Sequence, residues 1–128
     1  MQIFSKTDRG RVRTDNQDAY FAGKITDDAV FAVVCDGMGG ANAGNVASEL
    51  AVRHISEYVI RSYRSGMNMT DTEKTLKNAI VSANISLYDK AVNNTELAGM
   101  GTTTVAAFVK DGTAVIAHVG DSRIYLVN

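Results

Sequence analysis

The segment of residues 29–35 constrains the fold more than any other part of the sequence. Every residue in it is apolar, in the order Ala-Val-Phe-Ala-Val-Val-Cys, and a glycine-rich stretch at residues 37–44 follows it closely. A short apolar run that ends in turn residues is typical of a strand buried on both faces. Such a strand needs a covering layer on each side of its sheet, so the segment predicts a layered protein of α and β elements.

Hydrophobic periodicity predicts two helices between two groups of strands. Apolar residues recur at helical spacing over residues 46–63 and again from Thr70, which has the spacing of a capping box with Glu73. Further strands are expected at residues 2–5, 19–22, 102–109, 114–119 and 124–127. This order differs from the regular alternation of a doubly wound parallel sheet. We therefore expect a single α+β domain over residues 1–128, with antiparallel sheets covered by helices.

The composition excludes several classes of protein. The 128 residues are 45% hydrophobic, and their 13 basic and 14 acidic side chains are interspersed. We therefore expect neither a nucleic-acid partner nor a membrane partner. No stretch approaches the roughly 20 apolar residues of a membrane helix, and the first residues lack the pattern of a signal peptide. Cys35 is the single cysteine and fits a reducing compartment, so we expect a soluble, cytoplasmic protein.

Asp36 is the first candidate functional residue, because it directly follows the apolar segment and precedes Gly37. A carboxylate and a neighbouring backbone carbonyl are oxygen ligands of the kind that magnesium and manganese prefer. Gly37 and Gly39 also begin a dinucleotide-binding fingerprint, but its last position is Asn42, and Asp36 would repel a pyrophosphate. A plain glycine turn is the structural alternative.

Other polar residues are ambiguous when each is taken alone. Arg13 and Asp18 stand at the entrance of an expected strand, and Asp121 lies in a turn between two others. By itself Arg13 is typical of a solvated surface residue, and Asp121 is typical of a turn residue. His54 and His118 fall on apolar patterns, and we interpret both as hydrogen-bonded core histidines.

Taken together, the motifs at residues 13–18, 36–40, 101–103 and 120–123 resemble those of the type 2C-like, metal-dependent serine/threonine protein phosphatases. The methionine at position 38 and the Asn-Gln-Asp run at 16–18 are similar to the bacterial branch of that family. The resemblance spans nearly the whole chain. It implies a four-layer α-β-β-α sandwich of antiparallel sheets flanked by helices, of which this chain holds the N-terminal half.

For chemistry, the resemblance implies a centre of two manganese or magnesium ions, with a third ion at a weaker site that includes Asp121. Asp36 would bridge the two ions, Gly37 would contribute its carbonyl oxygen, and Asp18 would act through bound water. Two cations that share a water lower its pKa, so that it can attack phosphorus without a covalent intermediate. Arg13 would hold the phosphoryl oxygens with its planar guanidinium.

The chain also departs from the family pattern. Met38 occupies a position where some relatives carry a histidine, so the acid that protonates the leaving group is unassigned. The family domain continues for roughly another hundred residues, with two further metal-binding aspartates. We therefore expect little or no phosphatase activity from these residues alone, and a non-catalytic regulatory or scaffolding module is the alternative reading.

The expected partners follow from the same reading. They are phosphorylated proteins, a cognate serine/threonine kinase pathway and, because half-sheet edges invite pairing, an edge-paired or domain-swapped dimer.

Overall fold

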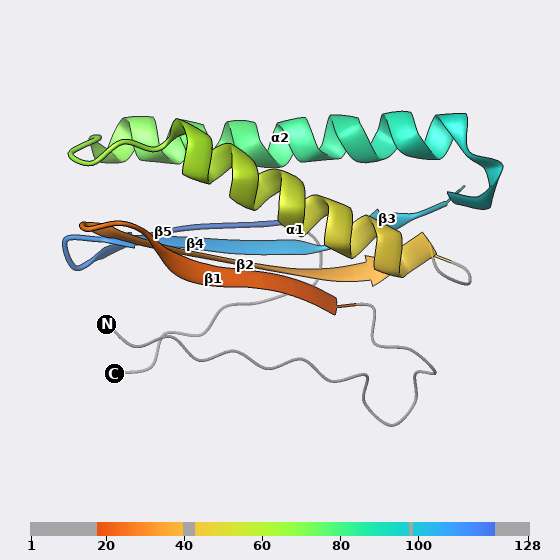
Figure 1. Cartoon of the computed structure of the whole chain (residues 1–128), viewed down its shortest axis with the longest axis horizontal. Helices are drawn as coiled ribbons and strands as arrows, with labels where there is room; N and C mark the ends of the chain where they lie inside the picture. Colours follow the sequence, from red (N-terminus) through yellow and green to blue (C-terminus); the bar gives the residue numbers. More distant parts are fainter. Residues whose placement is uncertain (1–17, 40–42, 98, 120–128) are drawn as a thin grey trace, which may run out of the picture.

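A computed structural model describes residues 18–39, 43–97 and 99–119. Within them, strands form one antiparallel sheet, and two long helices pack together on one of its faces (Figure 1). The elements are β1 (Asp18–Thr26), β2 (Ala29–Met38), α1 (Ala43–Ser62), α2 (Met69–Asn93), the short 3-10 helix η1 (Thr95–Leu97), β3 (Gly101–Thr102), β4 (Thr104–Lys110) and β5 (Thr113–Val119). The expected α+β class is confirmed, and the described residues supply two of the four layers.

The sheet has the strand order β1-β2-β4-β5, and β3 pairs with the last residues of β2. β3 and β4 lie in one register along the same edge of β2, separated only by Thr103. The tight turn expected between the last two strands is confirmed, since Asp111 and Gly112 join β4 to β5 with φ of 51° and 72°. Two positive φ angles are the mark of a type I′ hairpin. The strands expected at residues 2–5 and 124–127 lie outside the described residues.

Among the described residues, β2 is covered on one face only, so the burial on both faces that its apolar sequence predicts is not found there. Phe31, Val33 and Cys35 are 0% exposed beneath the helices, whereas Val34 is 47% exposed on the opposite face. The helices follow the sheet on one side only (Figure 1). The apolar residues on the other face therefore mark a second surface of the sheet that the described residues leave partly open.

The core lies between the helices and the centre of the sheet. The ring centroid of Phe108 lies 6.0 Å from that of Phe31 and 4.7 Å from that of Tyr63, so the rings link β4 to β2 and to the end of α1. Ile55 and Leu76 contribute the largest buried side chains of α1 and α2. Tilted aromatic pairs at these separations add to the free energy gained by burying their area.

The start of α2 differs from the expected capping box at Thr70. Asn68 is the N-cap, and its side-chain oxygen accepts a hydrogen bond from the Asp71 amide at 2.8 Å. Asparagine caps a helix as well as threonine does, and the N-cap lies two residues earlier in the chain than expected. None of the helices in the described ranges combines the length and apolarity that a membrane span needs.

A polar cluster joins the β1–β2 turn to the loop between the helices. Asp28 accepts hydrogen bonds from the Thr26 hydroxyl, the Gly66 amide and the Tyr63 hydroxyl, the last two at 3.2 and 3.1 Å. Those from Thr26 and then Gly66 contribute most to lowering the pKa of Asp28 from 3.8 to about 2. The ammonium of Lys110 donates to the Met67 carbonyl and lies 5.1 Å from the Tyr63 ring centroid.

Replacing Tyr63 with phenylalanine should lower the melting temperature by several degrees near neutral pH, because it removes one hydrogen bond to an ionised carboxylate. Asp28 has a depressed folded-state pKa, so its stabilisation is complete above 3.8 and is lost as the pH falls through about 2. The difference between the variant and the original chain should therefore shrink as the solution is acidified. Melting curves followed by circular dichroism over this range test the expectation, and a difference that stays constant would contradict it.

Candidate functional site

The site is built on the pairing of β1 with β2, which places Asp18 directly opposite Asp36. Residues opposite each other in an antiparallel pair project from the same face of the sheet, with Cβ atoms roughly 4.5–5.5 Å apart. Cys35 points into the helical layer, so both carboxylates project from the other face. Two acidic side chains that are 18 positions apart in the sequence thus meet at one place on the sheet.

Thr103 fixes the backbone of Asp36 on the opposite edge of β2. The Thr103 amide donates to the Asp36 carbonyl at 2.9 Å, and the Asp36 amide donates to the Thr103 hydroxyl oxygen at 3.2 Å. Sequence reasoning assigned Thr103 to a family motif but gave it no role. Its signal was weak, because Thr103 is one of three consecutive threonines, and its contact with Asp36 spans 67 positions.

The Asp-Gly-Met motif lies inside β2, which corrects the expectation that the strand ends at Cys35 and presents Asp36 in a turn. Gly37 and Met38 pair with Thr102 and Gly101 of β3, so the ladder continues past the carboxylate. Gly37 is buried, and Met38 is 50% exposed. Asp36 is therefore held by strands on both sides, and its backbone position is more rigid than a loop would allow.

Gly39 ends the strand in a conformation that other residues rarely adopt. Its φ is 139°, and a Cβ atom placed there would lie 2.9 Å from the Ala43 Cβ and 3.3 Å from the Met100 Cα. The glycine thus lets the end of β2 pass closely between the first turn of α1 and the residue before β3.

Replacing Gly39 with alanine should destabilise the fold by about 1–3 kcal/mol, because the substitution combines backbone strain with a clash. The matched control is Gly112→Ala, where φ is also positive but no heavy atom lies within 4 Å. Urea unfolding of both variants should show the larger loss for Gly39→Ala. Equal losses would mean that the close approach at Gly39 costs nothing.

The donor groups at this place fit a hard divalent cation. The carboxylates of Asp18 and Asp36 and the carbonyl of Gly37 are oxygen ligands, which magnesium and manganese prefer. Within the described ranges, no group of three or more His, Cys, Asp and Glu side chains gathers in a way that could hold a metal ion. The ligand set formed by these residues is therefore chemically suitable and incomplete.

Two other candidate residues, Arg13 and Asp121, lie outside the described residues, and their roles stay predictions.

The two histidines differ in their surroundings. The expected hydrogen bond of His54 is confirmed, since its ring shares a bond of 2.9 Å with Ser82 that links α1 to α2, but the residue is only partly buried. His118 is exposed on β5, so its interpretation as a core residue is wrong. The single cysteine, Cys35, is fully buried, and this burial raises the pKa of its thiol.

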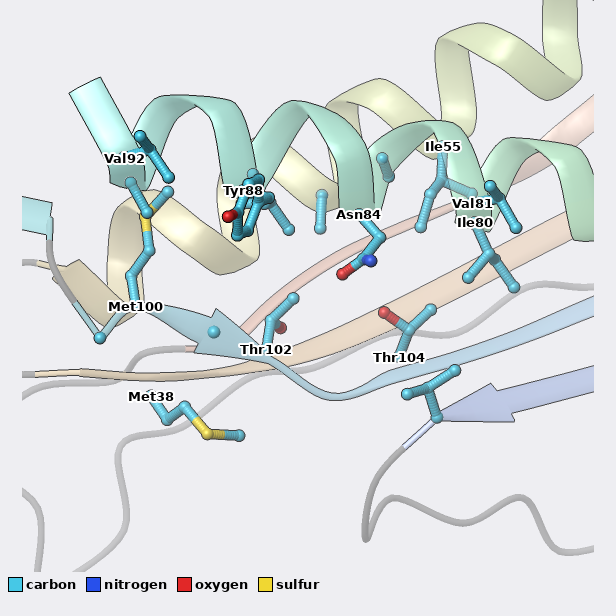
Figure 2. A pocket seen from close by; sticks show the side chains of 17 residues that line it. Met38, Ile55, Ile80, Val81, Asn84, Tyr88, Val92, Met100, Thr102 and Thr104 are labelled. Carbon is cyan, nitrogen blue, oxygen red and sulfur yellow. The ribbon is translucent and has the colours of Figure 1, made fainter. Parts of the chain in front are cut away.

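An apolar pocket adjoins the end of the motif. It has a volume of about 820 Å³ and extends from Met38 and β3 beneath the second half of α2 (Figure 2). Thr102, Thr104 and Asn84 bring polar atoms to it, and Tyr88 and Val92 of α2 line its outer end. The side chains of Asp18 and Asp36 do not line this pocket, so it is separate from the paired carboxylates.

Comparisons with known proteins agree on one family. The model of the family described as protein phosphatase 2C matches residues 7–128. The serine/threonine phosphatase stp of Listeria monocytogenes is 40% identical over 122 residues, which cover 95% of this chain and 48% of that protein. The crystal structure of Stp1 from Staphylococcus aureus superposes with a TM-score of 0.85 at 38% identity, over 96% of this chain and 48% of that one.

A more distant structure, the serine/threonine phosphatase PstP/Ppp of Mycobacterium tuberculosis, has a TM-score of 0.76 at 31% identity, over 92% of this chain and 46% of that one. The chain thus spans about half the length of the Listeria relative and of the two solved structures.

Proposed function

Because the chain belongs to the protein phosphatase 2C family, we propose that it forms the N-terminal half of a domain that hydrolyses phosphoserine and phosphothreonine in proteins. The observation that carries the proposal is the register of β1 and β2, which brings Asp18 opposite Asp36 on one face of the sheet. In the proposed reaction, manganese or magnesium ions supply an acidified water as the nucleophile and neutralise charge on the phosphoryl group.

Each candidate site residue has a defined task in this proposal. Asp36 would hold the ions directly together with the Gly37 carbonyl, and Asp18 would orient a water molecule beside them. Thr103 keeps the Asp36 backbone in place through its two hydrogen bonds, of 2.9 and 3.2 Å. Arg13 binds the phosphoryl oxygens, and Asp121 belongs to a weaker third metal site; both assignments rest on the family resemblance.

The cellular setting is a proposal of the same kind. We expect the domain to act in the cytoplasm, on proteins phosphorylated by a serine/threonine kinase of the same pathway. The Listeria relative carries the name of a serine/threonine phosphatase, which supports the substrate class.

Manganese titration of this chain by calorimetry, followed by phosphate release from a phosphothreonine peptide, tests the proposal. We expect weak binding and little turnover, since the described carboxylates form an incomplete ligand set. A chain extended to the length of the relatives should bind more tightly and turn over. Failure of the extended form to release phosphate with either metal would exclude the enzyme and leave a non-catalytic phosphatase-like module as the function.

A further inference from the structure

The second half of α2 carries a row of exposed apolar residues, called here the α2 stripe. Its four side chains are each at least half exposed: Val81 50%, Ile85 56%, Tyr88 69% and Val92 63%. At roughly 3.6 residues per turn they share one side of the helix, opposite the buried Thr72, Leu76, Ala79 and Ala83. Residues 63–68 and 94–97, which flank α2 in the chain, also belong to the described ranges. Single exposed apolar residues are ordinary, but a contiguous row of them marks an interaction surface.

The spacing of the α2 stripe is that of the seam between two paired helices. Its residues are separated by four, three and four positions, as apolar residues are along a coiled-coil contact. Val81, Tyr88 and Val92 also stand at the mouth of the 820 Å³ pocket (Figure 2). The spacing therefore favours a helix as the partner, and a helix over the stripe would cover this mouth as well.

We propose that the partner helix is α2 of a second copy of the chain, packed antiparallel to the first. The spacing of four, three and four reads the same in both directions, so a two-fold axis between Ile85 and Tyr88 brings each stripe residue beside another. Ile85 then lies beside the partner's Tyr88, and Val81 lies beside the partner's Val92. The apolar side chains of one stripe are thus covered by those of the other.

Charges at the two ends of the stripe favour this direction of pairing. Lys77 precedes Val81 by four positions, Glu96 in η1 follows Val92 by four, and both charged side chains are exposed. The same two-fold axis places Lys77 near the partner's Glu96, where opposite charges attract. Parallel pairing would instead place Lys77 beside the partner's Lys77. This self-complementarity points to a second copy as the partner, and it does not depend on the phosphatase chemistry.

Sedimentation velocity of the chain at micromolar concentrations should show a species with twice the 13.7 kDa mass. Ile85→Glu would bury a charge at the centre of the contact, so we expect this variant to sediment as a folded monomer with an unchanged circular dichroism spectrum. Ile60→Glu is the matched control, because Ile60 is 49% exposed on α1, outside the stripe, and it should remain dimeric. A monomeric original chain would overturn the proposal. So would a dimer that Ile85→Glu leaves intact, as an edge-paired or domain-swapped dimer would be.

Cysteine substitution tests the direction of pairing separately. In the antiparallel pair, position 81 of one copy lies beside position 92 of the other, and neither lies beside its own counterpart. A mixture of Val81→Cys and Val92→Cys chains should therefore form a mixed disulfide under mild oxidation, in preference to disulfides within either variant alone. The buried Cys35 should take no part. Preferential cross-linking of each variant to itself would show parallel pairing and overturn the proposal.

A chain extended to the length of its relatives tests whether the rest of the domain covers the stripe instead. We expect the extended chain to be dimeric and its Ile85→Glu variant to be monomeric. A monomeric extended chain would mean that the added residues cover the stripe, and would exclude the second copy. In dilute solution, where the pair dissociates, substitutions in the stripe should leave the urea midpoint of the chain unchanged.

Discussion

Replacing Asp36 with asparagine should abolish manganese binding by this chain and metal-dependent phosphate release by an active form extended to the length of its relatives. The substitution keeps the shape of the side chain but removes its charge. Asp36 lies opposite Asp18 in the register of β1 and β2, and its backbone is hydrogen-bonded to Thr103. Loss of a direct ligand should exceed the roughly 10–100-fold loss of metal affinity that follows removal of an outer-shell partner. Calorimetric titration and a phosphate assay measure the two effects.

Two further variants distinguish the loss of a direct metal ligand in Asp36→Asn from the loss of other contacts in the site. Asp18→Asn should weaken manganese binding by roughly 10–100-fold without abolishing it, because we assign Asp18 a contact through water. Arg13→Ala should leave metal binding unchanged and lower kcat/KM, since we assign it to the phosphoryl group. Activity of Asp36→Asn equal to that of the original sequence would refute the metal-assisted mechanism.

Replacing Phe108 with alanine should destabilise the chain by about 3–5 kcal/mol. Phe108 is 1% exposed, and its ring packs against Phe31 of β2 and Tyr63 at the end of α1. The substitution removes ring contacts between the helical layer and the centre of the sheet, and the surrounding strands can close the cavity only in part. Small domains have a free energy of unfolding of roughly 5–15 kcal/mol in total. This loss should therefore strongly lower the urea concentration at the midpoint of unfolding.

Tyr88→Ala is the control for the Phe108 substitution. It deletes an aromatic ring of similar size that is 69% exposed on α2. Exposed positions without special contacts usually change stability by less than about 0.5 kcal/mol. If both variants lost the same stability, the stack around Phe108 would not be the centre of the core.

Elements with strong local patterns were predictable from the sequence. The apolar segment of residues 29–35 became the first part of β2, the two periodic segments became α1 and α2, and the Asp111-Gly112 pair became the β4–β5 turn. Their boundaries were less accurate: β2 continues to Met38 and α2 is capped by Asn68. The first difference arose from pairing with β3, which local propensity does not encode, and the second from a choice between two competent caps close together in the sequence.

The candidate site was predictable only as a set of residues. Asp18 and Asp36 were both selected from the sequence, with different expected roles, but the sequence did not indicate that they would be opposed in one register. It also gave no role to Thr103. Such facts depend on which strands pair and in which register, and a shift of one residue would have sent Asp36 to the other face.

By itself, then, the sequence determined the α+β class, the order of the elements and the carboxylates available for a metal, because these depend on periodicity and residue type close along the chain. Only the tertiary structure decided that the helices cover one face of the described sheet and that Asp18 and Asp36 share the other. The physical reason is that register and burial come from contacts between segments distant in sequence, whose free energies no local pattern records.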